Sequence, residues 1–351
     1  MQILHNEQGK LPKGTARDYP LFPNRGFMLD VARKFFTMDY LKQYVKILSF
    51  YKMNEFQIHL NDNGFPQFFG DDWNRTYAAF RLESERFPGL TAKDGSYSKQ
   101  EFIDLQRMGL EYGVRIIPEI DIPAHSLAFA HYKPEIASRK YGMDHLDLYK
   151  KETYQFVDSL LDEYLSGDNP VFIGDLHIGT DEYNKKEAEQ YRYFTDRYLK
   201  FVEKYGKNVR MWGGLKWLPG KTPVKAEGVT VNAWSYDWVD PVVSLQDGYK
   251  LINTCDTYLY IVPAAGYYRD FLDHQWIYEK WSPWIMNRKQ TLPEGTPGVL
   301  GGMFAVWNDK CGNGISEQDV HLRSFPAMQV LAEKLWKGEN KNVTYEAFAK
   351  L

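Results

Sequence analysis

The sequence lacks the features that define several classes of protein. Cysteine occurs only twice, at Cys255 and Cys311, which is too few for a disulfide framework or a thiolate metal site. No run of about 18 consecutive apolar residues occurs, so the sequence predicts no membrane span. The first residues, Met1 to Glu7, have neither the charged start nor the apolar core of a signal peptide.

The sequence also lacks an excess of basic residues. Its 43 Lys and Arg stand against 46 Asp and Glu, for a net charge of -3, and no basic run could follow a phosphate backbone. We therefore expect no nucleic-acid partner. Internal repeats and low-complexity tracts are absent too, which favours an ordinary globular fold.

Aromatic residues, in contrast, are abundant. The chain holds 10 Trp, 25 Tyr and 21 Phe, or 16% of its residues. Many of them must belong to the core, but Trp side chains at strand ends also suit stacking on the apolar faces of sugar rings. Composition by itself indicates carbohydrate binding only weakly.

Strand-like and helix-like segments alternate along most of the chain. Strands are predicted at 26–31, 55–60, 114–120, 171–178, 209–212, 229–234, 250–262 and 299–307. The clearest helices are predicted at 38–51, 98–112, 188–205 and 322–336. Eight strands alternating with helices predict the α/β class and a single (β/α)8 TIM barrel, with a loop insertion at 64–96. The predicted organisation is a leading loop segment (1–24), the barrel (25–338) and a C-terminal tail (339–351).

Two adjacent carboxylates, Asp181 and Glu182, follow the apolar segment 170–176. Successive side chains of a strand point to opposite faces, so these two can share a site only where the strand ends and the backbone turns. Barrel enzymes keep their chemistry at that end of the strands. An isolated acidic pair would more simply open the next helix, because acidic residues suit a helix N-terminus.

Polar and aromatic residues recur at the C-terminal ends of the other predicted strands. Those ends converge on one mouth of a barrel, so the sequence predicts a ring of carboxylates and indoles around one pocket. The residues concerned are Asn61, Asp62, Asp121, His125, Trp212, Trp234, Tyr258, Tyr260, Trp307 and Asp309.

Four segments carry a resemblance to a known family. RGFMLDVAR (25–33), PEIDIPAH (118–125), HIGTDE (177–182) and GGMFAVW (301–307) resemble the catalytic barrel of glycoside hydrolase family 20. That family includes β-N-acetylhexosaminidases and lacto-N-biosidases. The resemblance extends over residues 25–338, in the expected order of strands.

The resemblance implies substrate-assisted catalysis, in which the 2-acetamido carbonyl oxygen of the sugar attacks its own anomeric carbon. Glu182 would be the general acid and then the base, and Asp181 would hold the acetamide N–H and stabilise an oxazolinium intermediate. Tyr258 or Tyr260 would donate to the acetamide oxygen. Because Glu182 adjoins an anionic Asp181 and an apolar wall, we expect its pKa to be raised.

The resemblance also assigns residues that bind the substrate. Trp212, Trp234 and Trp307 would enclose the acetamide and the sugar face, and His125, with Asp62, would tune the acid. Arg25 would bind sugar hydroxyls, although the predicted strand places it at the opposite end from the mouth. No cofactor or metal is implied.

One residue suggests the subtype. Many family hexosaminidases have Glu two residues after the Trp of strand eight, whereas this chain has Asp309. The shorter acid, Tyr183 and the segment 260–263 look more like the lacto-N-biosidase branch, which releases Gal-β1,3-GlcNAc. Gln57 could line the extra space. A β-N-acetylhexosaminidase that releases single GlcNAc or GalNAc units is the alternative.

Other functions stay open. The barrel could be a catalytically silent module that binds glycans, or a conventional glycosidase with Glu119 or Asp121 as nucleophile. Asp121, His125 and His177 could in principle hold a metal, but no typical ligand spacing is present. We expect an oligosaccharide or glycoconjugate as partner, and a secreted or cell-surface location for the full-length protein.

Overall fold

The predicted barrel is present in the computed structural model, which describes residues 13–15, 17–340 and 342–350. Eight parallel strands form the barrel in the order β1-β2-β5-β8-β9-β10-β11-β13, and β13 pairs with β1 to close it. The strands are β1 (Asn24–Asp30), β2 (Glu55–His59), β5 (Arg115–Glu119), β8 (Leu176–His177), β9 (Val209–Trp212), β10 (Val229–Ala233), β11 (Lys250–Asn253) and β13 (Val299–Val306).

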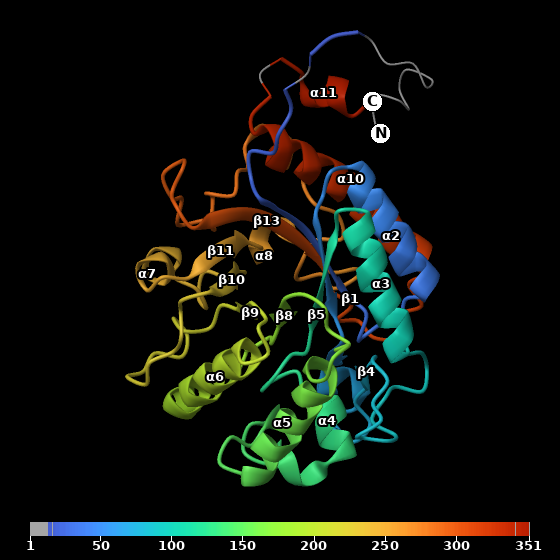
Figure 1. The fold of residues 1–351 in the computed structure, drawn as a ribbon, viewed down its shortest axis with the longest axis vertical. Helices are drawn as coiled ribbons and strands as arrows, with labels where there is room; N and C mark the ends of the chain where they lie inside the picture. The colour runs from blue at the N-terminus through green and yellow to red at the C-terminus, as the bar shows by residue number, and fades with distance from the viewer. Residues whose placement is uncertain (1–12, 16, 341, 351) are drawn as a thin grey trace.

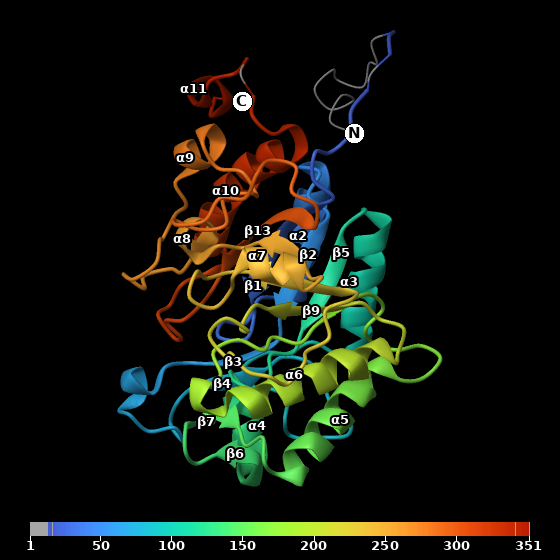
Figure 2. The same ribbon diagram turned by 90° about the vertical axis from the view of Figure 1, so that its left-hand side faces the viewer.

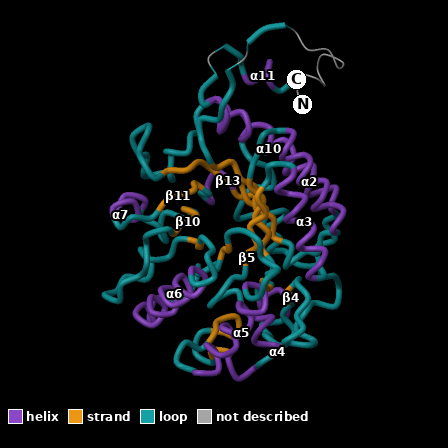
Figure 3. The backbone as a smooth tube through the Cα atoms, viewed as in Figure 1, coloured by secondary structure: helices purple, strands orange, loops and turns teal. Residues whose placement is uncertain are grey.

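Helices surround the strands, as Figures 1 and 3 show. They are α2 (Met38–Phe50), α3 (Lys99–Glu111), α4 (Leu127–Tyr132), α5 (Lys151–Leu165), α6 (Ala188–Glu203), α7 (Pro241–Gln246), α8 (Asp256–Leu259), α9 (His274–Glu279), α10 (Glu317–Lys337) and α11 (Tyr345–Phe348). The described residues also form three short 3-10 helices, η1 (Pro66–Phe69), η2 (Pro134–Ile136) and η3 (Lys185–Glu187). No helix within the described ranges is both long and apolar enough to cross a membrane.

The predicted capping box is present at the start of α3. The Ser98 side chain accepts from the backbone N–H of Glu101, and the Glu101 carboxylate accepts from the backbone N–H of Ser98. Phe102 and Leu105 then face the core at helical spacing. The insertion at 64–96 carries β4 (Ala78–Phe80), which pairs with β3 (Asn61–Asn63) outside the barrel. A second small hairpin joins β6 (Ala137–Ser138) and β7 (Gly142–Leu146).

The fourth strand is much shorter than predicted. Val171, Phe172 and Ile173 bond to neighbouring helices instead of to strands: the N–H of Phe172 donates to the Tyr164 carbonyl, and that of Ile173 donates to Oε1 of Gln106. Only β8 joins the barrel. Val171 and Phe172 are apolar because they are buried, not because they belong to a strand ladder.

The seventh strand is broken in two. β11 ends at Asn253, whose side chain accepts from the N–H of Cys255 and helps to turn the chain into α8. The chain re-enters as β12 (Tyr260–Ile261), which pairs with the end of β13. The prediction of one strand over 250–262 was wrong, because polar Asn253 and Thr254 end the extended segment.

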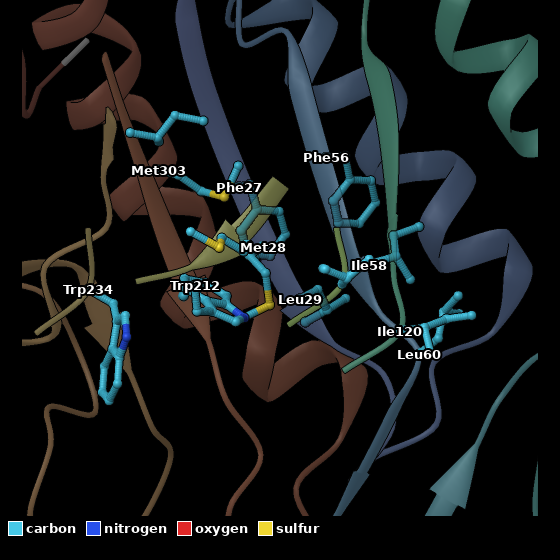
Figure 4. Close-up of a cluster of buried hydrophobic side chains, with 14 of the residues drawn as sticks. Phe27, Met28, Leu29, Phe56, Ile58, Leu60, Ile120, Trp212, Trp234 and Met303 are labelled. Atoms are coloured by element: carbon cyan, nitrogen blue, oxygen red, sulfur yellow. The ribbon is translucent and has the colours of Figure 1, made fainter. Parts of the chain in front are cut away.

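The inside of the barrel is filled in layers. Phe27 stacks between Phe56 and Phe304, with ring centroids 5.3 and 4.6 Å apart, and Figure 4 shows these strands' apolar side chains packed together. At the N-terminal end Arg210 pairs with Glu55 at 2.6 Å. This packing fills the part of the barrel nearer the N-terminal ends of the strands. A site can therefore form at their C-terminal ends.

Candidate active site

The turn after β8 brings both carboxylates to one side of the chain. Gly179, Thr180 and Glu182 have φ angles of 67°, 82° and 51°. Left-handed backbone is costly for residues with a side chain, and it clusters at functional sites. A Cβ atom at Gly179 would lie 1.7 Å from Oδ1 of Asp121, so only glycine fits there. The turn lets Asp181 and Glu182 line the same cavity.

The acidic pair does not open a helix. Asn184 caps η3, accepting from the N–H of Lys186, and α6 begins only at Ala188. The helix-opening interpretation of Asp181 and Glu182 was therefore wrong.

A cavity of about 220 Å³ lies at the C-terminal ends of the strands. Its walls combine carboxylates, one guanidinium and several aromatic rings. They are formed by Arg33, Phe65, His125, Asp181, Glu182, Trp234, Tyr260, Tyr267, Tyr268, Trp307 and Asp309.

His125 connects Glu182 to Asp62. Nε2 of His125 lies 3.3 Å from Oε2 of Glu182, and Nδ1 lies 2.9 Å from Oδ1 of Asp62. Asp62 itself is fully buried and does not line the cavity. Burial would lower the pKa of His125, but the charges of Asp62, Asp121 and Asp181 outweigh it and hold the pKa well above 6.5. His125 is therefore a cation next to Glu182.

The pKa of Glu182 is shifted in the opposite direction from the predicted one. Crowding around Glu182 would raise its pKa, but the hydrogen bond and charge of His125, then Arg33, outweigh it and lower the pKa. The Glu182 side chain is also 48% exposed, against 9% for Asp181. The prediction of a raised Glu182 pKa was wrong, because it omitted the cation that faces this carboxylate.

Asp181 is the carboxylate with the raised pKa. Burial raises it to about 6 against the opposing charge of His125, and Glu182 adds to the rise. Asp121 lies beneath, 1% exposed, and its Oδ1 accepts from the N–H of Thr180 at 3.1 Å. Burial and the charge of Asp181 raise the pKa of Asp121 well above its ordinary value. Each of these two buried carboxyls therefore disfavours the charge of the other.

Arg33 occupies the far side of the cavity. Its Nη1 lies 2.8 Å from Oδ2 of Asp62, 3.1 Å from Oδ2 of Asp30 and 3.4 Å from Oδ1 of Asp309. Asp309 also accepts from the Tyr267 hydroxyl at 2.8 Å. A cation and an acid with fixed geometry can bind sugar hydroxyls together, because one donates and the other accepts.

Trp234, Trp307 and Tyr260 form the apolar side. They are 6%, 8% and 5% exposed, and the Tyr260 ring lies 5.8 Å from that of Trp307. The indole of Trp234 is fixed by its N–H, which donates to the Gly213 carbonyl at 2.8 Å. Such rings can enclose an acetamide methyl group and one face of a sugar.

The structure places Arg25 away from this cavity. It pairs with Gly302 at the start of β1, and its guanidinium donates to the carbonyl oxygens of Phe22 and Lys52, both at 2.7 Å. The prediction that Arg25 binds the substrate does not fit this position, and Arg33, which ends the same motif, lines the cavity instead. Arg33 follows β1 at its C-terminal end, where barrel sites lie.

Gln57 and Trp212 are also outside the cavity. Both side chains are fully buried and donate to Glu119 inside the barrel, at 2.7 and 2.6 Å. Figure 4 shows Trp212 among the core side chains and Trp234 to one side. Glu119 is therefore not placed as a nucleophile. His177 packs at the same depth with a pKa lowered by burial to about 4, which makes it a neutral core residue.

The break in strand seven places Tyr258 and Tyr260 in different elements. Tyr258 lies on α8, and its ring stacks on Trp276 at 4.4 Å beside a separate cavity. Tyr260 lies on β12 and faces the cavity that Asp181 and Glu182 line. The two-residue period placed both on one face, which fails because α8 interrupts the strand.

Four lining residues were not predicted: Arg33, Phe65, Tyr267 and Tyr268. Arg33 could have been found from its place directly after strand one. Phe65 comes from the insertion, and Tyr267 and Tyr268 come from the loop after β12. No periodic pattern exists in such loops, so sequence reasoning had no signal for them.

Two groups of side chains have the composition of a metal site. They are Asp121, His125 and Asp181, and His59, Glu119 and Asp121. Both imidazoles are already engaged: His59 lies between Asp62 and Glu119, at 2.6 and 3.0 Å, and its pKa is raised well above 6.5 because these two carboxylates outweigh the effect of burial. These contacts join both groups into one buried network of imidazoles and carboxylates.

Comparisons with known proteins agree with this geometry. The sequence profile for the catalytic domain of glycosyl hydrolase family 20 matches residues 22–339. The chain is 27% identical to β-hexosaminidase subunit B2 of Dictyostelium discoideum, over 95% of this chain and 60% of that protein. It thus spans less than two thirds of the length of this relative.

Solved structures share the fold. The β-N-acetylhexosaminidase from Bacteroides fragilis has a TM-score of 0.74 at 21% identity, over 95% of this chain and 70% of that one. The GH20 exo-β-N-acetylglucosaminidase from Vibrio harveyi, in complex with N-acetylglucosamine, has a TM-score of 0.72 at 20% identity, over 94% of this chain and 56% of that one.

Proposed function

Because the chain belongs to glycosyl hydrolase family 20, we propose that it is a retaining exo-β-glycosidase that removes terminal β-linked N-acetylhexosamine units by substrate assistance. One observation carries the proposal. The left-handed turn at 179–182 presents Asp181 and Glu182 together to a cavity walled by Trp234 and Trp307.

In the first step the acetamide oxygen of the substrate attacks the anomeric carbon, and the bond to the leaving oxygen breaks. Glu182 gives its proton to that oxygen. Asp181 accepts the acetamide N–H and balances the positive charge of the oxazolinium ring. Tyr260 donates a hydrogen bond from its hydroxyl to the acetamide oxygen. In the second step Glu182 takes a proton from water while the water oxygen bonds to the anomeric carbon, and the bond from that carbon to the acetamide oxygen breaks, which restores the acetamide with net retention.

The proton for this chemistry is held between His125 and Glu182. With His125 charged, the pair carries the one proton that the acid step needs. A bound sugar removes water from the exposed side of Glu182, which raises its pKa and draws the proton across the 3.3 Å contact. Asp62 keeps the imidazole oriented while this occurs.

The finer proposal is that the unit released is the disaccharide Gal-β1,3-GlcNAc. Asp309 supports it: this acid is one methylene shorter than glutamate and is drawn back by Arg33 and Tyr267, which leaves more room at the end of the cavity. Release of single GlcNAc or GalNAc units is the alternative. A secreted or cell-surface location for the full-length protein is part of the same proposal, since glycoconjugates are found there.

A direct comparison of substrates tests both levels. The protein is incubated with nitrophenyl β-N-acetylglucosaminide, nitrophenyl β-N-acetylgalactosaminide and nitrophenyl lacto-N-bioside, and nitrophenol is measured. Release from the lacto-N-bioside in one step supports the finer proposal, and release only from a monosaccharide substrate supports the alternative. Release from none of them, with glycan binding retained, would make the barrel a binding module.

A further inference from the structure

Thr180, the residue before Asp181, is held at all three of its polar groups. It has a left-handed φ of 82° although its side chain is β-branched, and it is fully buried. Its N–H donates to Oδ1 of Asp121 at 3.1 Å, and its hydroxyl donates to the Trp212 carbonyl at 3.4 Å. Its own carbonyl accepts from the hydroxyl of Tyr191 at 2.6 Å. Strained backbone of this kind persists only where its surroundings over-determine it, so these contacts hold the turn in place.

Tyr191 makes its contact from a helix outside the barrel. It is a fully buried residue of α6, which lies beside β9 as Figure 2 shows. Gly214 leaves room for the bond, because a Cβ atom there would lie 2.6 Å from the Tyr191 hydroxyl and 3.3 Å from the Thr180 carbonyl oxygen. Among the residues that the structure describes, Tyr191 alone donates to this carbonyl. Tyr191 does not line the cavity with Asp181, so it acts on the site through the Thr180 backbone.

The bonded carbonyl belongs to the peptide group that joins Thr180 to Asp181. A peptide group is planar, so its orientation sets the ψ angle of Thr180 and the φ angle of Asp181 together. Burial raises the pKa of the Tyr191 hydroxyl to about 12, so the hydroxyl stays protonated and donates at neutral pH. The direction of the Asp181 side chain therefore depends on a hydrogen bond that lies outside the cavity.

We propose that Tyr191 is a positioning residue, which fixes the direction of the Asp181 carboxylate through the Thr180 carbonyl. The role rests on the proposed function, in which Asp181 accepts the acetamide N–H and balances the oxazolinium charge. That charge develops only as the reaction proceeds, so a misdirected carboxylate lowers kcat more than it raises KM. Loss of the hydroxyl leaves a buried carbonyl without a donor, and the turn can then relax.

Two tyrosines of α6 form a matched pair of variants. Tyr191→Phe removes only the hydroxyl that bonds to Thr180. Tyr198→Phe makes the same change at another buried tyrosine, whose hydroxyl donates to Asp158 at 3.0 Å and which does not line the cavity. In nitrophenol release, we expect kcat to fall about tenfold or more in Tyr191→Phe with KM within about threefold. Tyr198→Phe should keep kcat within about twofold, although both variants lose some thermal stability.

The ionisation of Asp181 provides a readout that needs no turnover. Burial raises its pKa to about 6. The ionisable groups that face it are His125, Glu182, Glu119, Asp121, Tyr260 and Tyr191. Protein labelled with ¹³C at the aspartate carboxyl carbon is titrated by NMR, and Asp181→Asn identifies the signal. A relaxed turn admits water to this carboxylate, so its pKa should fall by about half a unit or more in Tyr191→Phe and stay unchanged in Tyr198→Phe.

Three results would overturn the proposal. They are an unchanged Asp181 pKa in Tyr191→Phe, an equal pKa shift in Tyr198→Phe, or an unchanged kcat in Tyr191→Phe. Should Tyr191→Phe not fold, Gly214→Ala is measured by the same criteria, because its Cβ atom would displace the hydroxyl from Thr180. A wild type that turns over none of the substrates would refute the proposed activity, whereas the pKa shift would still decide whether Tyr191 positions Asp181.

Discussion

Nε2 of His125 lies 3.3 Å from Oε2 of Glu182, while the other ring nitrogen lies 2.9 Å from Asp62. The imidazole is therefore fixed between two carboxylates, one buried and one open to the cavity. Asp62 is in turn held by Arg33 at 2.8 Å. His125, which faces Glu182, and Arg33, which lines the cavity, thus share the buried carboxylate of Asp62.

Replacing Glu182 by glutamine should abolish the acid step and spare the rest of the site. We expect turnover of natural glycans to fall by about 10²–10⁴. Substrates with a good leaving group, such as dinitrophenyl glycosides, should lose much less, because their leaving oxygen needs no proton. Both classes are measured as kcat/KM on one preparation. Equal losses on the two classes would count against Glu182 as the acid.

The pH profile should be bell-shaped. Asp181 must be ionised, and burial raises its pKa to about 6, so kcat/KM should fall as pH drops through about 6. On the alkaline side the His125–Glu182 pair must keep its proton. Because the pKa of His125 is well above 6.5, kcat/KM should fall only at pH values well above 6.5. Asp181→Asn should lose about 10² or more in kcat/KM and also lose the acidic limb. Activity within about tenfold of wild type, or an unchanged limb, would remove Asp181 from this role.

Arg33 and Arg25 offer a matched comparison. Arg33→Lys loses the planar contacts to Asp30, Asp62 and Asp309, so kcat/KM should fall by about 10–100-fold. Arg25→Lys changes contacts to backbone carbonyl oxygens at the far end of β1, so it should lower the melting temperature and leave kcat/KM within about threefold. The reverse pattern would restore Arg25 as the residue that binds the sugar.

A thiazoline analogue of the N-acetylglucosamine or lacto-N-biose ring should inhibit competitively. It resembles the sugar after acetamide attack, so it should bind about 10² times more tightly than the product, or better. Inhibition constants for the analogue and the product are compared at one pH. As a complement, a fluorosugar that traps enzyme nucleophiles is followed by mass spectrometry. A covalent adduct on Asp181, Glu182, Glu119 or Asp121 would replace substrate assistance with a double displacement.

Chelators should leave activity intact. The proposed nucleophile is the acetamide of the substrate and Asp181 balances the positive charge that develops, so the proposed mechanism needs no metal. Activity is measured after dialysis against EDTA and again after addition of zinc or calcium. Activity that is lost on dialysis and restored by either ion would mean that Asp121, His125 and Asp181 form a metal site.

The sequence predicted the barrel because its signals are local and repeated. Alternating strands and helices require only hydrophobic periodicity and caps such as that of Ser98. The acidic pair was located because two neighbouring side chains can share a site only at a turn. In both cases the decisive constraint lies within a few residues of chain.

Other features depend on contacts that sequence spacing does not contain. The sign of the Glu182 pKa shift depends on His125, which is 57 positions away and reaches it through a separate strand end. The period of two failed for Tyr258, because a single turn of helix intervenes before Tyr260. Trp212 ends a strand as Trp234 does, yet Glu119 draws its indole into the barrel.

The break in strand seven makes one wall of the cavity separate from the seventh strand position of the barrel. β12 joins β13 through two residue pairs, Tyr260 with Ala305 and Ile261 with Val306, and Tyr267 and Tyr268 follow in the next loop. A register shift of one residue between β12 and β13 would place an aliphatic side chain where Tyr260 now lies. Changes among the roughly twenty residues between β11 and α9 can therefore reshape this wall without disturbing the eight-stranded frame that carries the acidic pair.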